Sequence, residues 1–143
     1  MIRLAAFDPG AAGFSALLEE SRSEGHRMVL RLAENWANGS NRFTRPGEIM
    51  LSAWAGERLA GICGRNIDPY DPGPRAGRVR HLYVAQDARR DGVGRLLISA
   101  IANGAAEYFD YLNTNAPETA FAFYKRMGFV PLNAPHVTNR LML

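Results

Sequence analysis

The stretch RRDGVGRLLISAIA, residues 89–102, decides the fold of this chain. From Val93 to Ile101 its apolar residues recur at positions i, i+3, i+4, i+7 and i+8, which predicts an amphipathic helix. The residues before it, RVRHLYVA (78–85), and after it, YFDYLNT (108–114), are both typical of strands. A strand, a helix and a second strand in this order predict a βαβ unit, whose two strands should be parallel.

The segments on either side of this unit also show strand or helix patterns. Further helices are predicted after an N-cap at Asp8, over about 27–36 and around 121–127. Further strands are predicted at 2–7, 48–55, 58–67, 129–132 and 137–143, with a tight hairpin turn at Gly56 and Glu57. The resulting order, β α α β β β α β α β β, predicts one α/β domain over residues 1–143 with a mostly antiparallel sheet.

The composition is ordinary for a globular domain. The chain has 143 residues, of which 47% are hydrophobic and 22% are charged. No apolar stretch approaches the ~20 residues that a membrane-spanning helix needs, and the first apolar run is too short for a signal peptide. Because Cys63 is the only cysteine, an internal disulfide is excluded, and we expect a cytoplasmic protein without a membrane partner.

The positive charge is carried almost entirely by arginine. The formal net charge is +3, the isoelectric point is near 9.4, and Lys125 is the only lysine. Arginine matches phosphate geometry, which favours an anionic ligand, but a genome rich in arginine codons explains the bias equally well. Because the basic residues are scattered, we expect no nucleic-acid partner. His26 and His136 lack partners at metal-ligand spacing, so we expect no metal site.

Two glycines and three arginines surround the start of the central predicted helix. A helix start exposes unpaired backbone N–H groups and the positive end of the helix dipole, so it favours an anion. Gly92 and Gly94 let the backbone approach a phosphate without a Cβ in the way, and Arg89, Arg90 and Arg95 add positive charge. A turn with a solvated basic rim has the same spacing, so the glycines alone leave both interpretations open.

Neither of two well-known phosphate-binding loops fits this stretch. The G-x-x-x-x-G-K-S/T pattern is absent, and Leu97 occupies the third glycine position of a dinucleotide-binding loop. The stretch instead resembles motif A of the GNAT superfamily of acetyl-CoA-dependent acetyltransferases, which reads Arg/Gln-x-x-Gly-x-Gly/Ala. Arg89, Gly92 and Gly94 match this motif in register.

A second motif supports the resemblance. AFAFYKRMGF (120–129) is similar to motif B of the same family, with Tyr124 in its usual place. One position departs from the pattern, because the family often has asparagine seven residues before the tyrosine and this chain has Pro117. Asn115 lies nearby and is our candidate for the cofactor contact that this asparagine makes in the family.

The resemblance implies a fold and a cofactor site. The fold is a mixed, mostly antiparallel central sheet with helices on both faces, and a splayed pair of parallel strands forms the coenzyme A site. Acetyl-CoA is the implied co-substrate, with its pantetheine arm on the main chain of one parallel strand and its pyrophosphate on the glycine loop. The cofactor-binding residues implied are Leu82, Tyr83, Val84, Arg89, Arg90, Asp91, Gly92, Val93, Gly94, Arg95 and Asn115.

Two residues are candidates for proton transfer. Tyr124 is the implied general acid, since a phenol can protonate a leaving thiolate, and its alternative role is core packing beside Phe123. The base is open, because Arg78 stands where several relatives carry a glutamate. His81 is the candidate base, although a structural histidine within the sheet is an equally good interpretation. Glu48, Asp68 and a chain of waters are the other options.

The acceptor is the part that the sequence leaves open, because specificity resides in loops. We expect the loops GSNRFTRPGE (39–48) and NIDPYDPGP (66–74) to shape its pocket, unless their polar residues only form turns. The candidate contacts are Asn41, Arg42, Asp68 and Tyr70.

Three functions compete. The leading hypothesis is an N-acetyltransferase, a monomer or homodimer, that moves an acetyl group to a primary amine of a small molecule or peptide by direct attack. The alternative is a non-catalytic coenzyme A-binding regulatory module with the same fold. A basic nucleic-acid-binding domain is the third, disfavoured by the scattered charge.

Overall fold

A computed structural model describes the whole chain, Met1–Leu143, as seven strands and four helices in the order that the sequence predicts. The strands form one sheet in the order β1-β2-β3-β4-β5-β7-β6. The elements are β1 (Ile2–Ala6), α1 (Phe14–Ser23), α2 (Met28–Asn38), β2 (Ile49–Ala55), β3 (Arg58–Ile67), β4 (Ala76–Val84), α3 (Val93–Ala102), β5 (Tyr111–Thr114), α4 (Phe121–Arg126), β6 (Val130–Ala134) and β7 (Val137–Met142).

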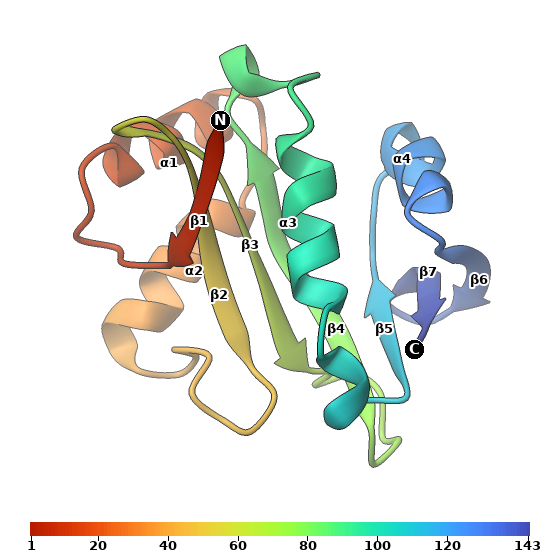
Figure 1. Cartoon of the computed structure of the whole chain (residues 1–143). Helices are drawn as coiled ribbons and strands as arrows, with labels where there is room; N and C mark the ends of the chain where they lie inside the picture. The colour runs from red at the N-terminus through yellow and green to blue at the C-terminus, as the bar shows by residue number, and fades with distance from the viewer.

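The sheet is antiparallel except between β4 and β5, which confirms the predicted parallel pair. These two strands pair only over Ala76–Arg78 and Tyr111–Asn113. Residues 79–84 of β4 have no ladder partner in β5, and the two strands diverge towards the ends that lead to α3 and α4 (Figure 1). The divergence leaves one edge of β4 open inside the sheet.

The helices cover both faces of the sheet. In Figure 1, α3 crosses the front of the sheet, while α1 and α2 lie behind it. Three of the four buried residues of α3, Val93, Leu97 and Ile101, belong to its predicted apolar stripe, whereas Leu96 of that stripe is exposed and Ile98 is buried instead. The helix contacts β2, β3 and β4. On the other face, α1 contacts β3 and α2 contacts β4. The sheet therefore has a buried core on each side. None of the helices has the length and apolar composition that a bilayer-spanning helix needs.

The predictions differ from the structure mainly at element ends. Asp8 is not the N-cap of α1, because its carboxylate accepts a hydrogen bond from the Gly10 amide (2.8 Å) and forms a local turn. The helix begins five residues after Pro9, at Phe14, with Gly13 as the N-cap in the left-handed region (φ 92°). The parallel strand predicted from residue 108 begins at Tyr111.

Two neighbouring leucines of α3 test how much this helix contributes to the core. Leu97 is fully buried, whereas Leu96 is 39% exposed. Leu97→Ala should lower the free energy of unfolding by about 2–5 kcal/mol, because it leaves a cavity between α3 and the sheet. Leu96→Ala should lower it by about 1 kcal/mol or less. Urea unfolding of both variants measures the difference, and equal losses would contradict this packing.

Candidate active site

A cleft of about 1220 Å³ opens where β4 and β5 diverge. Its walls come from the end of β4, the loop into α3, residues 114–120 and α4. The structure thus brings together most of the site residues that the sequence singles out, which come from four separate segments of the chain. Those on the cleft wall are His81, Leu82, Tyr83, Val84, Arg89, Arg90, Gly92, Val93, Gly94, Arg95, Asn115 and Tyr124, while Asp91 is not among them.

The glycines keep the start of α3 open to the cleft. Gly92 is the N-cap of α3 and lies in the left-handed region (φ 81°), which other residues adopt only with strain. A Cβ on Gly94 would point across the cleft to within 3.4 Å of the Phe123 ring of α4. The first amides of α3 have no helical acceptor, so this end of the helix offers N–H donors and positive potential to an anion.

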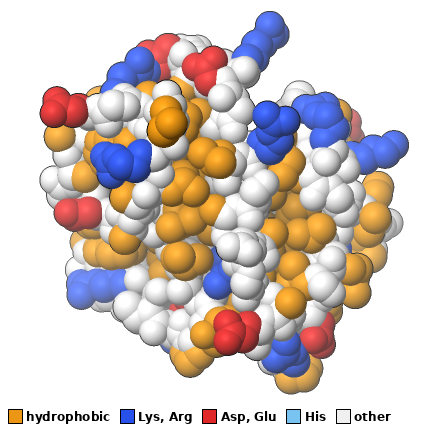
Figure 2. Space-filling model, viewed as in Figure 1, with side chains coloured by type: hydrophobic (Ala, Val, Ile, Leu, Met, Phe, Trp, Pro, Cys, Tyr) orange, Lys and Arg blue, Asp and Glu red, His pale blue; other side chains and the backbone are white.

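Positive side chains gather at the same end of the cleft. Arg90 and Arg95 lie beside the start of α3, and Arg126 lies on α4. None of the three has a carboxylate or hydrogen-bond partner in the protein, and all are exposed. Figure 2 shows Lys and Arg side chains over the upper ends of α3 and α4, on both sides of the hollow between them. The arrangement favours a ligand with several negative charges.

Arg89 differs from the other arginines because the protein supplies its counter-ion. Its guanidinium donates two hydrogen bonds to the carboxylate of Glu24, at 2.9 and 2.6 Å, and a third to the carbonyl of Val84 (3.1 Å). The Tyr83 hydroxyl donates to Glu20 (2.7 Å) and also contacts Glu24. This network joins the end of α1 to the loop that leads into α3, and neither glutamate carries a local sequence signal for it.

A β-bulge in β4 turns His81 towards the cleft. Arg80 pairs with Gly64 and Tyr83 with Ile62, so His81 and Leu82 both lie opposite a single residue of β3. His81 has φ 56°, a left-handed conformation that is strained for a residue other than glycine. Its side chain is only 8% exposed, and its Nε2 has no hydrogen-bond partner.

The surroundings of His81 keep its imidazole neutral. Burial, together with the positive charges of Arg80 and Arg31, lowers the pKa of His81 to about 3, while the backbone of Met28 acts in the opposite direction. A group with this pKa holds a proton poorly at neutral pH. The imidazole of His81 is therefore neutral at neutral pH, and its predicted role as general base stays a prediction.

Tyr124 lies on the α4 wall of the cleft with its ring in the core. The side chain is 5% exposed, and its ring packs edge-on against Phe123 (5.2 Å between centroids) and Phe129 (5.0 Å). Burial raises the pKa of Tyr124 above its ordinary value, so the phenol keeps its proton at neutral pH. Both interpretations of this residue fit the structure, since a packed ring and a protonated hydroxyl occur together.

The four predicted acceptor contacts do not line the cleft. Asn41 exchanges hydrogen bonds with Asn66 (2.9 and 3.2 Å), and Arg42 donates to the carbonyl of Trp36 (2.7 Å). Asp68 is buried and accepts a hydrogen bond from Asn113 (2.9 Å). The ring of Tyr70 stacks on His136 at 4.2 Å between centroids. These residues make contacts within the protein, and their role as acceptor contacts stays a prediction.

The other two candidates for the base, Glu48 and Asp68, are engaged elsewhere, and the single cysteine is buried. Burial opposes ionisation of Glu48, but hydrogen bonds from the Ile67 amide, Asn66 and Arg45 outweigh it and hold its pKa below the ordinary value. Asp68 forms an ion pair with Arg78 (3.5 Å). Cys63 is fully buried, and burial raises the pKa of its thiol.

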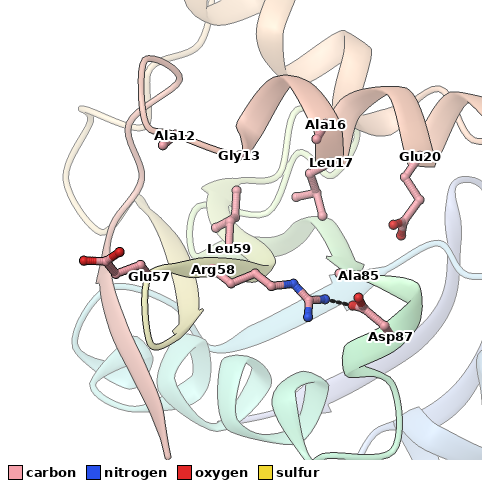
Figure 3. Close-up of a pocket in the computed structure, with 10 residues that line it drawn as sticks. All are labelled: Ala12, Gly13, Ala16, Leu17, Glu20, Glu57, Arg58, Leu59, Ala85 and Asp87. Atoms are coloured by element: carbon pink, nitrogen blue, oxygen red, sulfur yellow. Dashed lines mark ion pairs between the residues drawn. The ribbon is translucent and has the colours of Figure 1, made fainter.

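A second hollow, of about 500 Å³, lies between the start of α1, the start of β3 and the loop after β4. In Figure 3, Arg58 and Asp87 point toward one another across it as an ion pair, and Glu20 reaches in from α1. None of the candidate catalytic, cofactor-binding or acceptor-binding residues lies on its wall. The candidate chemistry therefore belongs to the larger cleft.

Known proteins share the family and the fold of this chain. Residues 14–143 match the family model described as an acetyltransferase (GNAT) domain. The fold is similar to that of a candidate acetyltransferase from Exiguobacterium sp. 255-15, at 29% identity and a TM-score of 0.86 over 99% of this chain and 92% of that chain. No curated protein is similar enough in sequence to count as a match.

Two more distant structures share the fold alone. A GCN5-related N-acetyltransferase from Kribbella flavida is 19% identical, with a TM-score of 0.70 over 99% of this chain and 98% of that chain. An aminoglycoside 6'-N-acetyltransferase, solved in complex with coenzyme A, is 17% identical, with a TM-score of 0.60 over 96% of this chain and 92% of that chain.

The Glu24–Arg89 pair should stabilise the fold at neutral pH and lose this effect at acidic pH. Hydrogen bonding from Arg89 is the main cause that lowers the pKa of Glu24 from 4.5 to about 2. A carboxylate whose folded pKa is lowered stabilises the fold above its unfolded pKa, and this contribution is lost as the pH falls from about 4.5 to about 2. Glu24→Gln should therefore lower the melting temperature at neutral pH, and the gap to wild type should close across this range.

Glu19→Gln is the matched control for this experiment. Glu19 lies on the same helix, is exposed, and makes no side-chain hydrogen bond. Its variant should melt like wild type at every pH. Thermal melts of the three proteins from neutral to acidic pH measure the effect, and a gap for Glu24→Gln that stays constant with pH would contradict the pairing.

Proposed function

The chain belongs to the GNAT family of acetyltransferases, and from that premise we propose that it transfers the acetyl group of acetyl-CoA to a primary amine of a small molecule or peptide. One observation carries the proposal: the open edge of β4, the start of α3, which has no side-chain cap, and the nearby arginines all face one cleft. The complex of an aminoglycoside N-acetyltransferase of the same fold with coenzyme A supports the choice of ligand.

The cleft fits the phosphates and the pantetheine arm of such a ligand. We assign the pyrophosphate to the amides around Gly92 and Gly94, with Arg90 and Arg95 as counter-charges. Arg89 orients this loop, because its guanidinium already binds Glu24. The main chain of residues 82–84 faces the gap left by β5, and its free groups can pair with the amides of the arm as a strand would. Asn115 stands on the opposite wall.

The proposed reaction needs one proton donor and one polarising group. The attacking amine forms a C–N bond to the acetyl carbon, the C–S bond breaks, and the thiolate takes a proton from the Tyr124 hydroxyl. A main-chain N–H of β4 would stabilise the oxygen that becomes negative during attack. Tyr124 suits its role because it stays protonated at neutral pH. It regains its proton from solvent.

In this proposal, His81 positions the attacking amine and does not take its proton. Its Nε2 is buried on the cleft wall without a partner, so it can accept a hydrogen bond from the attacking amine and aim the nitrogen lone pair. Because its pKa is about 3, the proton that the amine releases passes to water in the open cleft instead. This assignment replaces His81 as general base with His81 as a positioning residue.

Acetyl-CoA should stabilise the fold, and Gly94→Val should abolish the effect. A ligand at a hundredfold excess over its Kd stabilises a protein by about 2.7 kcal/mol. The valine methyl groups would reach towards Phe123 and fill the space at the start of α3 that we assign to the pyrophosphate. Ser99→Val, on an exposed position of the same helix, is the control for the lower helix propensity of valine. Thermal shift and calorimetry with acetyl-CoA measure both effects.

The outcomes separate the candidate functions. No thermal shift with millimolar acetyl-CoA would overturn the proposal. An equal affinity of wild type and Gly94→Val would show that the glycine only shapes a turn. Binding without thiol release across a panel of amines and peptides would identify the chain as a coenzyme A-binding regulatory module.

Tyr124→Phe tests the general acid. It removes one hydroxyl and keeps the ring that packs on Phe123 and Phe129. We expect kcat to fall by about 10²–10⁴-fold and the Kd for acetyl-CoA to stay constant, because general acid catalysis contributes on this order. Tyr108→Phe, at a residue that is 41% exposed, should leave kcat unchanged. A kcat for Tyr124→Phe within about twofold of wild type, with chemistry rate-limiting, would exclude the role.

A further inference from the structure

One half-buried arginine lacks a partner. Five arginines have side chains that are buried or half-buried, and four of them donate hydrogen bonds within the protein. Arg65 donates to the Gly47 carbonyl (2.7 Å), Arg75 to Asp110 (2.8 Å), Arg78 to the His136 carbonyl (2.8 Å) and Arg140 to Asn113 (2.7 Å). Arg80 forms neither a hydrogen bond nor an ion pair, although it lies in the middle of β4.

The charge of Arg80 is uncompensated as well as desolvated. Burial is the main cause that lowers the pKa of Arg80, and the positive charges of Arg78 and Arg31 lower it further. The one carboxylate that acts in the opposite direction belongs to Asp68, which already binds Arg78 and Asn113. A partly desolvated guanidinium with no counter-ion costs stability, so a protein that retains it favours binding of an external anion.

Arg80 is the sequence neighbour of a residue on the cleft wall, although its own side chain does not line the cleft. Arg80 directly precedes His81, whose buried and unpartnered Nε2 lies on the cleft wall. Arg31 belongs to α2, which packs against β4, and it has no side-chain partner either. Both arginines lie near enough to His81 to lower its pKa. Arg80 and His81 thus belong to the strand that α2 contacts, and neither the guanidinium of Arg80 nor that of Arg31 has a partner in the protein.

We infer that Arg80, with Arg31 beside it, binds an anionic group of the acceptor, so that the substrate is an amine that also carries a carboxylate or phosphate. The inference rests on the proposed acetyl transfer and specifies its substrate class. An acceptor whose nitrogen reaches His81 presents its anionic group to the neighbouring guanidinium. A polycationic amine, such as an aminoglycoside, would meet like charge there and should be a poor substrate.

Matched pairs of amines test the inference. Thiol release is followed for lysine against cadaverine, phenylalanine against phenethylamine, and phosphoethanolamine against ethanolamine. Wild type should prefer the anionic member of at least one pair by about tenfold or more in kcat/KM. The phosphate pair and the carboxylate pairs distinguish the two kinds of anion.

Arg80→Met assigns this preference to the guanidinium. It should raise KM for the preferred anionic amine by about 10- to 100-fold, which corresponds to a hydrogen bond to a charged group. KM for the counterpart without the anionic group should stay within about twofold. Its melting temperature should equal or exceed that of wild type, because the variant removes a charge without a partner. Arg22→Met, at an exposed arginine of α1, should change neither quantity.

Several results would overturn the inference. They are an equal preference for both members of every pair, a loss in Arg80→Met that affects both members alike, and a fall in its melting temperature like that of a broken ion pair. The same holds if no anionic amine is acetylated or raises the melting temperature of the protein loaded with coenzyme A. Failure of the proposed function is separate, because it would appear as the absence of a thermal shift with acetyl-CoA.

Discussion

The separation of β4 from β5 is the constraint on which the rest of the structure depends. The strands pair over three residues each, and the last six residues of β4 then face a gap instead of a neighbouring strand. Unpaired main-chain groups inside a sheet are unfavourable unless water or a ligand satisfies them. The gap also leaves room for α3 to start with its amides exposed and for α4 to stand opposite. The cleft, the exposed start of α3 and the position of Tyr124 on α4 therefore all follow from the separation of the two strands.

The bulge at His81 also affects which parts of the protein β4 contacts. Beyond the bulge, Tyr83 points its hydroxyl to Glu20 and Glu24 of the first helical layer, while Val84 approaches Gly94 on the other face. One strand thus contacts the α1 end, the cofactor loop and the reacting end of the cleft. Its strained residue is His81, whose conformation persists because antiparallel pairs with β3 fix the chain on both sides.

The order of elements follows from the sequence because periodicity is a local signal. The helix at 93–102 shows its stripe within ten residues, and the glycine loop precedes it directly. The pairing of Glu24 with Arg89 spans 65 positions and has no local signature. The bulge likewise has none, since histidine does not mark a left-handed residue as glycine does. Composition also does not reveal that the polar loop residue Asp68 is buried and binds Asn113 and Arg78 of two strands.

The two arginines of this region show how the fold divides its charges. Arg89 receives a bidentate carboxylate from the protein, so the loop that leads to the glycines is ordered before any phosphate binds. Arg80 receives none, although the chain places Asp68 near enough to influence its pKa. A preorganised loop benefits a ligand that every turnover uses, because less ordering entropy is then lost on binding. A guanidinium without a counter-ion helps the protein to discriminate between acceptors, because an acceptor without a negative group leaves the guanidinium unpaired and binds more weakly. The protein thus supplies a counter-ion to Arg89 at the loop into α3. It supplies none to Arg80 beside His81, and in our proposal the acceptor provides that negative charge.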